Sequence, residues 1–453
     1  MNRTIPPKPI SITLPLLNTQ KIRSAKMSVL LMYAIAYLYS YTVWDLHPKY
    51  YLLLTFLLIA FVEYVNRTLT LHTSAITAKL EYTVLLVSLI TQGFLLSTHY
   101  DPYSTDDFFF FQVIAVHLLF IFYVLTRSQQ LISQQFSWLS VIDGCRGIFV
   151  IPFSHFFIAI KILFIPSEVV SMNDSHKAKM IQLVKSILIA FITLVLLTFA
   201  INRLRNLSDT FDQFAQQHLI HLLQQFVSSL FSTVFSLDMI PLLFVSLPVW
   251  LWLYGLIGGA SFSHHFERTT SQTEAKLSRI QIFSAINISV VVTTLCVVYA
   301  TFFVVSLQDL IAQLNNIPSQ QALRASQASQ LAVTGFWQLI QITLLNLFVL
   351  GFSYLFGHRT LWQTTHSKAA LSVLLMFNLL FTLLAAWKLI ALYIVQFGLT
   401  PLRLQSAWLI SVILVATILA FIRLFKSITA FRYVATYFIV SYTFICAIYY
   451  YAF

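Results

Sequence analysis

The chain lacks the charge, the cysteine and the glycine that several protein classes require. Asp, Glu, Lys and Arg make up 9% of its 453 residues, whereas soluble domains carry about 25%. Ten glycines and twelve prolines exclude collagen-like and Gly/Pro-rich chains. Cys145, Cys296 and Cys446 lie far apart without CxxC or Cys/His spacing, so we expect neither a disulfide framework nor a zinc site. These absences exclude a soluble globular protein.

Sequence motifs of common catalytic and metal sites are also missing. No HExxH, GxSxG, GxxxxGK[ST] or GxGxxG occurs, and no Asp/Glu pair falls in an apolar run. His218 and His221 have the i, i+3 spacing of metal ligands, and residues 264–267 read HHFE, but both lack companion ligands. We therefore expect no metal and no cofactor, and enzymatic activity is not supported.

Long apolar runs dominate what is present. Hydrophobic residues make up 58% of the chain, and runs near twenty residues can each cross about 30 Å of hydrocarbon. The sequence predicts an all-α, polytopic helical membrane protein whose partner is the lipid bilayer. We expect about eleven transmembrane helices, at residues 27–44, 49–66, 80–98, 108–126, 182–201, 239–260, 281–307, 332–356, 370–396, 406–423 and 433–452.

The basic residues are distributed unevenly between the loops. With the N-terminus in the cytoplasm, twenty of the 27 lysines and arginines fall in cytoplasmic segments and five outside. Such an excess orients membrane proteins, which accounts for the net charge of +12 without a nucleic-acid partner. We expect a multi-pass protein of the bacterial cytoplasmic (inner) membrane.

Four regions follow from this threading. They are a cytoplasmic tail at 1–26, a four-helix segment at 27–126, a cytoplasmic or interfacial segment at 127–181, and a seven-helix region at 182–453 with an outer amphipathic loop at 203–238. Residues 147–164 are apolar enough to cross the membrane but contain Pro152, His155 and Lys161, so we interpret them as a re-entrant or interfacial helix. If they crossed, every later loop would change sides. Asp143 and Arg146 are three apart and can pair on one helical face.

A lysine inside an apolar helix is the most conspicuous polar group. Lys388 costs several kcal/mol in hydrocarbon unless it finds a partner, water or a route to the interface. It flanks a polar stripe, at about 100° per residue, made of Asn378, Thr382, Tyr393 and Gln396. The stripe indicates a face turned either to neighbouring helices or to a cavity that binds a small molecule.

Other polar residues of the predicted spans can likewise either contact neighbouring helices or line a binding cavity. The candidate binding groups among them are His117, Gln338, Gln341 and Asn346. Intramembrane histidines mark functional sites or packing contacts, and amides can join helices without a ligand. Glu63, four residues before Arg67, is interpreted as an interface anchor.

Three separated motifs resemble a bacterial membrane family catalogued as a domain of unknown function, the DUF4153/DUF4173 type. One family pattern consists of a basic residue, then Leu-Tyr, then Tyr-Gly-Leu/Phe-Thr and finally Arg. In this chain Lys388 resembles the basic residue, residues 392–393 the Leu-Tyr pair, residues 397–400 the Gly-Thr motif, and Arg403 the final arginine. Its Tyr-Ala-Arg-x-Gly-Phe-Trp-Glu-Leu stretch resembles residues 331–339 (LAVTGFWQL), and its Ser-x-Asp-x-x-Phe stretch resembles 208–214. Leu331, Val333, Gln338 and Phe397 depart from the pattern. The resemblance covers roughly residues 140–425 and implies a multi-pass membrane fold, with Arg403 as a further candidate binding group.

Two classes of function fit these features. One is a permease-like protein that moves or senses a small molecule. The alternative is a non-transporting membrane scaffold or envelope-stress sensor that acts through membrane-protein partners. Buried polar residues along a water-accessible path would favour the first class, and a sealed, leucine-packed core would favour the second.

Overall fold

The computed structural model describes residues 19–44, 47–69, 78–99, 107–164, 240–262, 281, 283–315, 325–357 and 364–452. Nearly all of these residues are helical, and the β-structure among them is one isolated bridge between Phe283 and Gly357. Within these ranges nine helices are long and apolar enough to cross a membrane. The predicted all-α, polytopic membrane fold is confirmed. The count of eleven and the cytoplasmic N-terminus stay predictions.

Two predicted spans are not among those nine. Residues 27–44 do form a helix, α1 (Thr19–Tyr39), which continues into the π-helical turn η1 (Ser40–Trp44). Residues 182–201, like the predicted outer loop 203–238, lie outside the described residues.

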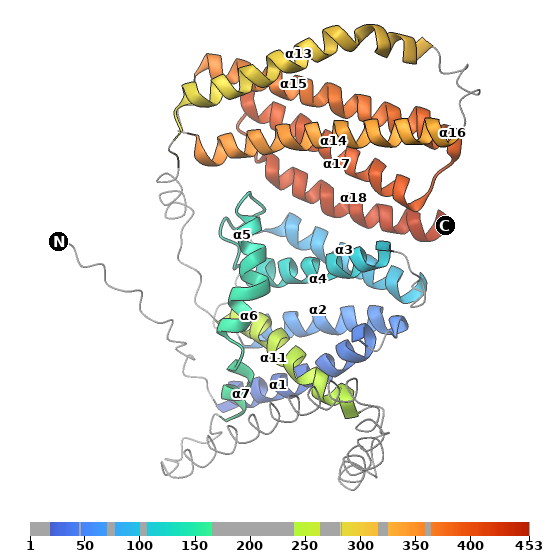
Figure 1. Cartoon of the computed structure of the whole chain (residues 1–453). Coiled ribbons are helices and arrows are strands. Elements are labelled where there is room, and N and C mark those ends of the chain that lie inside the picture. Colours follow the sequence, from blue (N-terminus) through green and yellow to red (C-terminus); the bar gives the residue numbers. More distant parts are fainter. Residues whose placement is uncertain are drawn as a thin grey trace, which may run out of the picture. The chain divides into compact units, whose positions relative to one another are not determined.

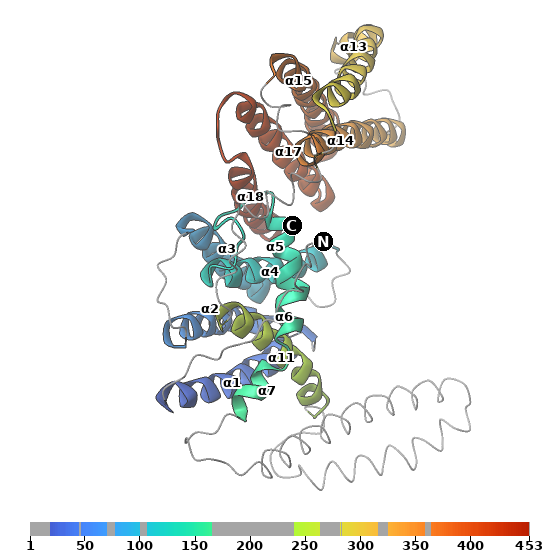
Figure 2. The same ribbon diagram turned by 90° about the vertical axis from the view of Figure 1, so that its left-hand side faces the viewer.

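The chain divides into two compact units, whose helices are drawn in Figures 1 and 2. The first comprises Met1–Asp45 and Phe156–Gly255, with α1, α7 (Ile158–Leu163) and most of α11 (Ile240–Phe262). In it α1 packs on α11: the Trp250 indole N–H donates to the Val29 carbonyl (3.0 Å), and the hydroxyls of Ser28 and Tyr254 lie 3.0 Å apart. Hydrogen bonds from polar side-chain groups thus join two otherwise apolar helices.

The second unit begins with three antiparallel helices (Figure 1). A short 3₁₀ turn, η2 (Pro48–Tyr50), leads into α2 (Tyr51–Thr68), which is followed by α3 (Lys79–His99) and α4 (Asp107–Arg127). Gly93 permits close approach of α3 to α2, because a Cβ placed there would meet the Thr55 side chain at 2.6 Å. The last helix, α18 (Ala430–Ala452), packs on α3 and also on α17.

The remaining helices of this unit share a second core. They are α13 (Ala285–Asn315), α14 (Ala325–Phe356), α15 (Thr365–Trp387), the π-helical segment η8 (Lys388–Ile394), α16 (Val395–Phe397) and α17 (Pro401–Phe425). Their buried apolar side chains form one cluster that includes Tyr299, Ile340, Leu374, Phe381 and Ile413. The apolar side chains that recur along each span therefore pack against those of the neighbouring helices.

Contacts within this unit place many helix ends at one face. Glu81 pairs with Arg432 at the starts of α3 and α18, and Trp138 after α4 stacks edgewise on Tyr354 near the end of α14. We call this end the basic face, after Arg67, Lys79, Arg127, Arg146, Lys368, Arg423, Lys426 and Arg432. The threading had placed all of them on one side, in the cytoplasm.

A broken helical segment runs across this face. Helix α5 (Ser140–Cys145), the π-helical turn η3 (Arg146–Val150) and α6 (Ile151–Ser154) follow one another at a steep angle to α2, α3 and α4 (Figures 1 and 2). The helix stops at His155, whose ring lies so close to Gly259 that a Cβ there would meet it at 2.7 Å. Residues 147–164 thus contain short helices, and their interfacial location stays a prediction.

Candidate functional site

The polar stripe of α15 is largely satisfied by its neighbours. The Asn378 side-chain amide donates to the Thr417 hydroxyl of α17 at 2.8 Å, and the Thr382 hydroxyl donates to the backbone carbonyl of Asn378, one turn earlier on α15, at 2.7 Å. Both side chains are fully buried. The side-chain oxygen of Asn378, Oδ1, has no hydrogen-bond partner among the described residues.

Asn346 of α14 is buried in the same core. Its side-chain oxygen accepts a hydrogen bond from the Tyr299 hydroxyl of α13 at 2.8 Å. Tyr299 in turn packs edgewise against Phe381, with ring centroids 5.1 Å apart. This amide joins α14 to α13, which is the helix-joining role that amides play in membranes.

Lys388 is the first residue of the π-helical segment η8. Its side chain is half-buried, and in the part of the chain that the structure describes it has neither a hydrogen bond nor a salt bridge. Segments with π geometry inside α-helices are frequent at functional sites. Asn378 lies ten residues earlier, about 15 Å along the helix, so Lys388 and the buried amide belong to different levels of the bundle.

The motif after Lys388 forms a helical corner. Gly398 has φ +76° and ψ 172°, a conformation essentially restricted to glycine, and Pro401 begins α17. The Arg403 guanidinium donates to the carbonyls of Phe397 and Gly398 and lies 4.0 Å from the centroid of the Tyr393 ring. Tyr393 and Arg403 therefore meet and close the turn; the Gln396 side chain lies outside the described part.

The remaining predicted residues are not brought together with Lys388. A ring nitrogen of His117 lies 2.6 Å from the Val113 carbonyl, on α4. Gln338 and Gln341 are exposed on α14. The nine candidates whose side chains the structure describes are thus distributed over several levels of the second unit instead of lining one cavity.

Sequence reasoning missed the extent of a charge cluster around Glu63. Its carboxylate accepts hydrogen bonds from Arg67 (3.3 Å), Arg127 (2.8 Å), Tyr82 (3.1 Å) and Tyr123 (3.1 Å). The pair with Arg67 was readable from its i, i+4 spacing, but the other partners come from α3 and α4. With both oxygens occupied, this carboxylate is a structural tie between helices, and its role as an interface anchor stays a prediction.

A second tie joins α3 to α18. The Arg432 guanidinium binds the fully buried Glu81 carboxylate through two bonds of 2.7 and 3.0 Å, and the Phe136 backbone N–H adds a third. Bidentate pairs of this kind are the strong ones. Arg432 lies 351 residues from Glu81, so no local spacing could reveal the pair.

The predicted pair of Asp143 and Arg146 is confirmed, with a nitrogen–oxygen distance of 3.0 Å. Asp143 is fully buried and also accepts from the Ile132 backbone N–H. Burial raises the pKa of the Asp143 carboxyl to about 6, although Ile132 and Arg146 oppose the shift. The loop after α4 is therefore tied to α5 through a carboxyl group that titrates unusually high.

Deeper in the membrane, α3, α4 and α18 share an amide ladder. The Gln112 amide donates to the Gln92 oxygen at 2.6 Å, and the Tyr450 hydroxyl donates to the Gln112 oxygen at 2.6 Å. Both glutamines are fully buried. Together with Glu81 and Arg432, the ladder holds α18 to α3 and α4 at two depths.

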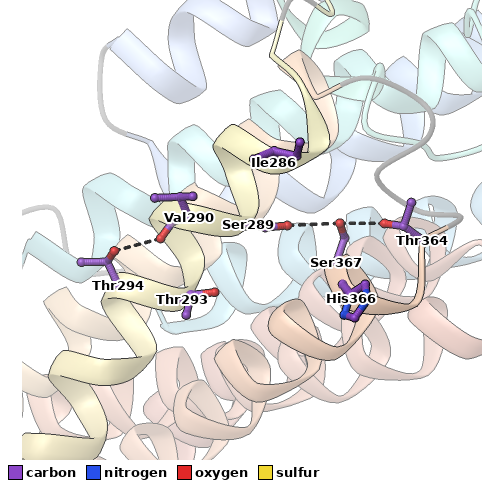
Figure 3. Close-up of a pocket in the computed structure, with 8 residues that line it drawn as sticks. All are labelled: Ile286, Ser289, Val290, Thr293, Thr294, Thr364, His366 and Ser367. Carbon is purple, nitrogen blue, oxygen red and sulfur yellow. Dashed lines mark hydrogen bonds between the residues drawn. The ribbon is translucent and has the colours of Figure 1, made fainter.

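One pocket lies near the basic face, where α13 and α15 begin. Its volume is about 470 Å³, and its lining residues, shown in Figure 3, are Ile286, Ser289, Val290, Thr293, Thr294, Thr364, His366 and Ser367. Ser367 links its two walls: its hydroxyl lies 3.2 Å from that of Ser289 and accepts from Thr364 at 2.8 Å. We call this the α13–α15 pocket. It offers hydroxyl groups and one imidazole within walls that are otherwise apolar.

No group of three or more metal-ligating side chains occurs among the described residues. His218, His221 and residues 264–267, which sequence analysis had examined as ligands, lie outside that part of the chain.

Comparisons with known proteins give one result. Neither the curated proteins nor the solved structures contain a match to this chain. The model of one family, described as a domain of unknown function (DUF4153), matches residues 82–453. That range includes α3 and every later helix of the structure, and with it the corner at Gly398 and Arg403. The chain belongs to the DUF4153 family of multi-pass membrane proteins.

Proposed function

We propose that this membrane protein senses a small molecule by binding it in the α13–α15 pocket. The observation that carries the proposal is the pocket itself, with about 470 Å³ of space and hydroxyl and imidazole groups on an apolar wall. Ligand sites are of this size and character, since apolar walls supply affinity and a few polar groups fix orientation.

The buried polar groups support sensing more than passage through the bundle. Asn378 and Asn346 bond to neighbouring helices, and Thr382 bonds to the backbone of its own helix, inside a core of leucine, isoleucine and phenylalanine. A transport path would instead need polar groups that face a wet cavity. Transport through the bundle is therefore the less favoured part of the proposal.

A second candidate function is a scaffold that acts through membrane-protein partners. The ties at Glu63 and Glu81 favour it, because paired and buried charges fix helices in one arrangement. A rigid helical body of this kind could hold a partner without any ligand.

Filling the pocket separates the two candidates. Thr293→Trp places an indole at the pocket, whereas Thr301→Trp, two turns later on α13, adds the same bulk to an exposed position outside it. The parent and both variants are purified from membranes, and co-purifying compounds of all polarities are extracted and compared by mass spectrometry. We expect at least one species to be lost from Thr293→Trp and kept by Thr301→Trp. Identical profiles in all three proteins would contradict ligand binding in the pocket and favour the scaffold.

A further inference from the structure

The depth of the α13–α15 pocket indicates which molecules can reach it. The pocket lies beside two candidate spans, Ile286–Val304 and Thr365–Ala391. From Ile286 to Thr294 it follows α13 for eight residues, about 12 Å, from the end of the span into the membrane. A ligand lying along the pocket is therefore partly within hydrocarbon.

The opening of the pocket faces the surroundings of the helices. Ile286 is 75% exposed and Val290 is 60% exposed, on a helix whose span is only 22% buried. In a bilayer these side chains meet acyl chains. Entry is thus sideways from the membrane, which favours an amphiphile over a water-soluble compound.

The two ends of the pocket differ in polarity (Figure 3). Thr364, His366 and Ser367 lie at one end, at the start of α15. At the other end Thr294 donates its hydroxyl to the Val290 carbonyl at 2.9 Å, so the wall there consists of its methyl group, the valine side chain and Thr293. The imidazole and most of the hydroxyl groups thus lie toward the helix start and fewer polar groups lie deeper down, which matches the order of head group and acyl chain in a lipid.

Charge near the polar end selects the sign of the head group. Lys368 follows directly on His366 and Ser367 at the start of α15. Basic residues beside a membrane surface attract anionic lipids.

We propose that the α13–α15 pocket binds an anionic phospholipid, with an acyl chain along α13 and the phosphate near Thr364 and His366. The proposal rests on the proposed function, because it names the class of ligand for the same pocket. The lipid reaches its site from the bilayer and stays bound when the protein is extracted.

The test uses the full-length protein, delipidated in detergent. Native mass spectrometry and thermal unfolding follow the addition of phosphatidylglycerol, phosphatidylcholine or water-soluble glycerol 3-phosphate, for the parent, Thr293→Trp, Thr301→Trp and His366→Ala. We expect the parent and Thr301→Trp to retain phosphatidylglycerol and to gain thermal stability from it, and Thr293→Trp to lose both effects. His366→Ala should weaken binding of phosphatidylglycerol and leave that of phosphatidylcholine unchanged.

Each other outcome has a distinct meaning. If glycerol 3-phosphate stabilises the parent as well as phosphatidylglycerol does, the acyl-chain proposal is wrong while the pocket remains a binding site. Equal effects of the two lipids would overturn the anionic preference. If Thr293→Trp retains lipid as the parent does, and also keeps every compound found in the extraction experiment, both the lipid proposal and the proposed function fail.

Discussion

A carboxylate with no exposed surface, such as that of Glu81, is stable in its charged form only beside a cation. Arg432 supplies that cation through two hydrogen bonds. Removing one partner of a buried pair costs about 3–5 kcal/mol, because the other charge is left uncompensated. At the level of single residues, this pair and the Glu63 cluster are the contacts whose loss matters most.

Arg432→Met is expected to lower the thermal stability of the protein in detergent strongly. The double variant Glu81→Leu with Arg432→Met should recover much of the loss, since it leaves no unpaired charge. Arg423→Met is the matched control, because Arg423 is exposed and contacts the neutral Tyr354, through its ring and its hydroxyl, instead of a buried carboxylate. Thermal aggregation of the four proteins measures the effect, and a single variant as stable as the control would show that the tie carries little energy.

Asp143 gives the protein an unusual pH dependence. Its pKa rises from an ordinary 3.8 to about 6 in the folded protein, so between these values the folded state binds more protons than the unfolded state. Stability therefore falls as the pH rises through this window, by about 3 kcal/mol at most for this one group.

Asp143→Asn should remove this contribution, because an amide does not titrate. We expect the difference in unfolding temperature between the variant and the parent to change between pH 4 and 6 and to be constant from pH 7 to 8. A difference that does not vary with pH across the window would show that Asp143 titrates normally.

Among the helices, the corner between α16 and α17 shows what a motif can and cannot predict. Glycine and proline are common where helices end, and Gly398 and Pro401 lie at this turn in the structure. The π-helical geometry of Lys388–Ile394 was not predictable, since π and α segments share the same apolar spacing. Helix existence followed from composition, whereas the local geometry around Lys388 depends on the packing of η8 against α14 and α17.

Two glycines make a test of the corner. Gly398→Ala should destabilise the protein by about 1–3 kcal/mol, because φ +76° with ψ 172° is essentially closed to other residues. Gly351→Ala on α14 should stabilise it by about 1 kcal/mol, since a Cβ there meets nothing within 4 Å and alanine favours a helix. The unfolding temperatures of both variants are compared with that of the parent. A shift of the same sign in both variants would contradict the conformational requirement for glycine at position 398.

For the whole molecule, the alternation of loop charge predicted the gathering of helix ends at the basic face. The sequence could not show which carboxylate meets which arginine there, because Glu81 and Arg432 have no local spacing in common. The sequence also offered no way to separate buried from exposed amides on α14 and α15, although Gln338 is exposed and Asn346 is buried. An apolar run predicts that a helix spans the membrane, whereas the face of that helix that is buried depends on the neighbouring helices.

The cytoplasmic location of the basic face can be tested with the native thiols. Cys145 is exposed at this face, whereas Cys296 and Cys446 are buried. An impermeant maleimide should leave Cys145 unlabelled in intact spheroplasts and modify it after permeabilisation. Leu399→Cys in a Cys145→Ser background should react in intact spheroplasts, because Leu399 is exposed at the opposite end. The reverse pattern would invert the predicted threading.

The pair of Glu81 and Arg432 also has a consequence in time. Ribosomes add about 5–20 residues each second, so Arg432 is made roughly 20–70 s after Glu81. Until then α3 carries a carboxyl group without its cation, and it must either hold a proton or stay near water. The tie between α3 and α18 therefore forms only after α18 has been made, so the first helices of this unit take their final arrangement late.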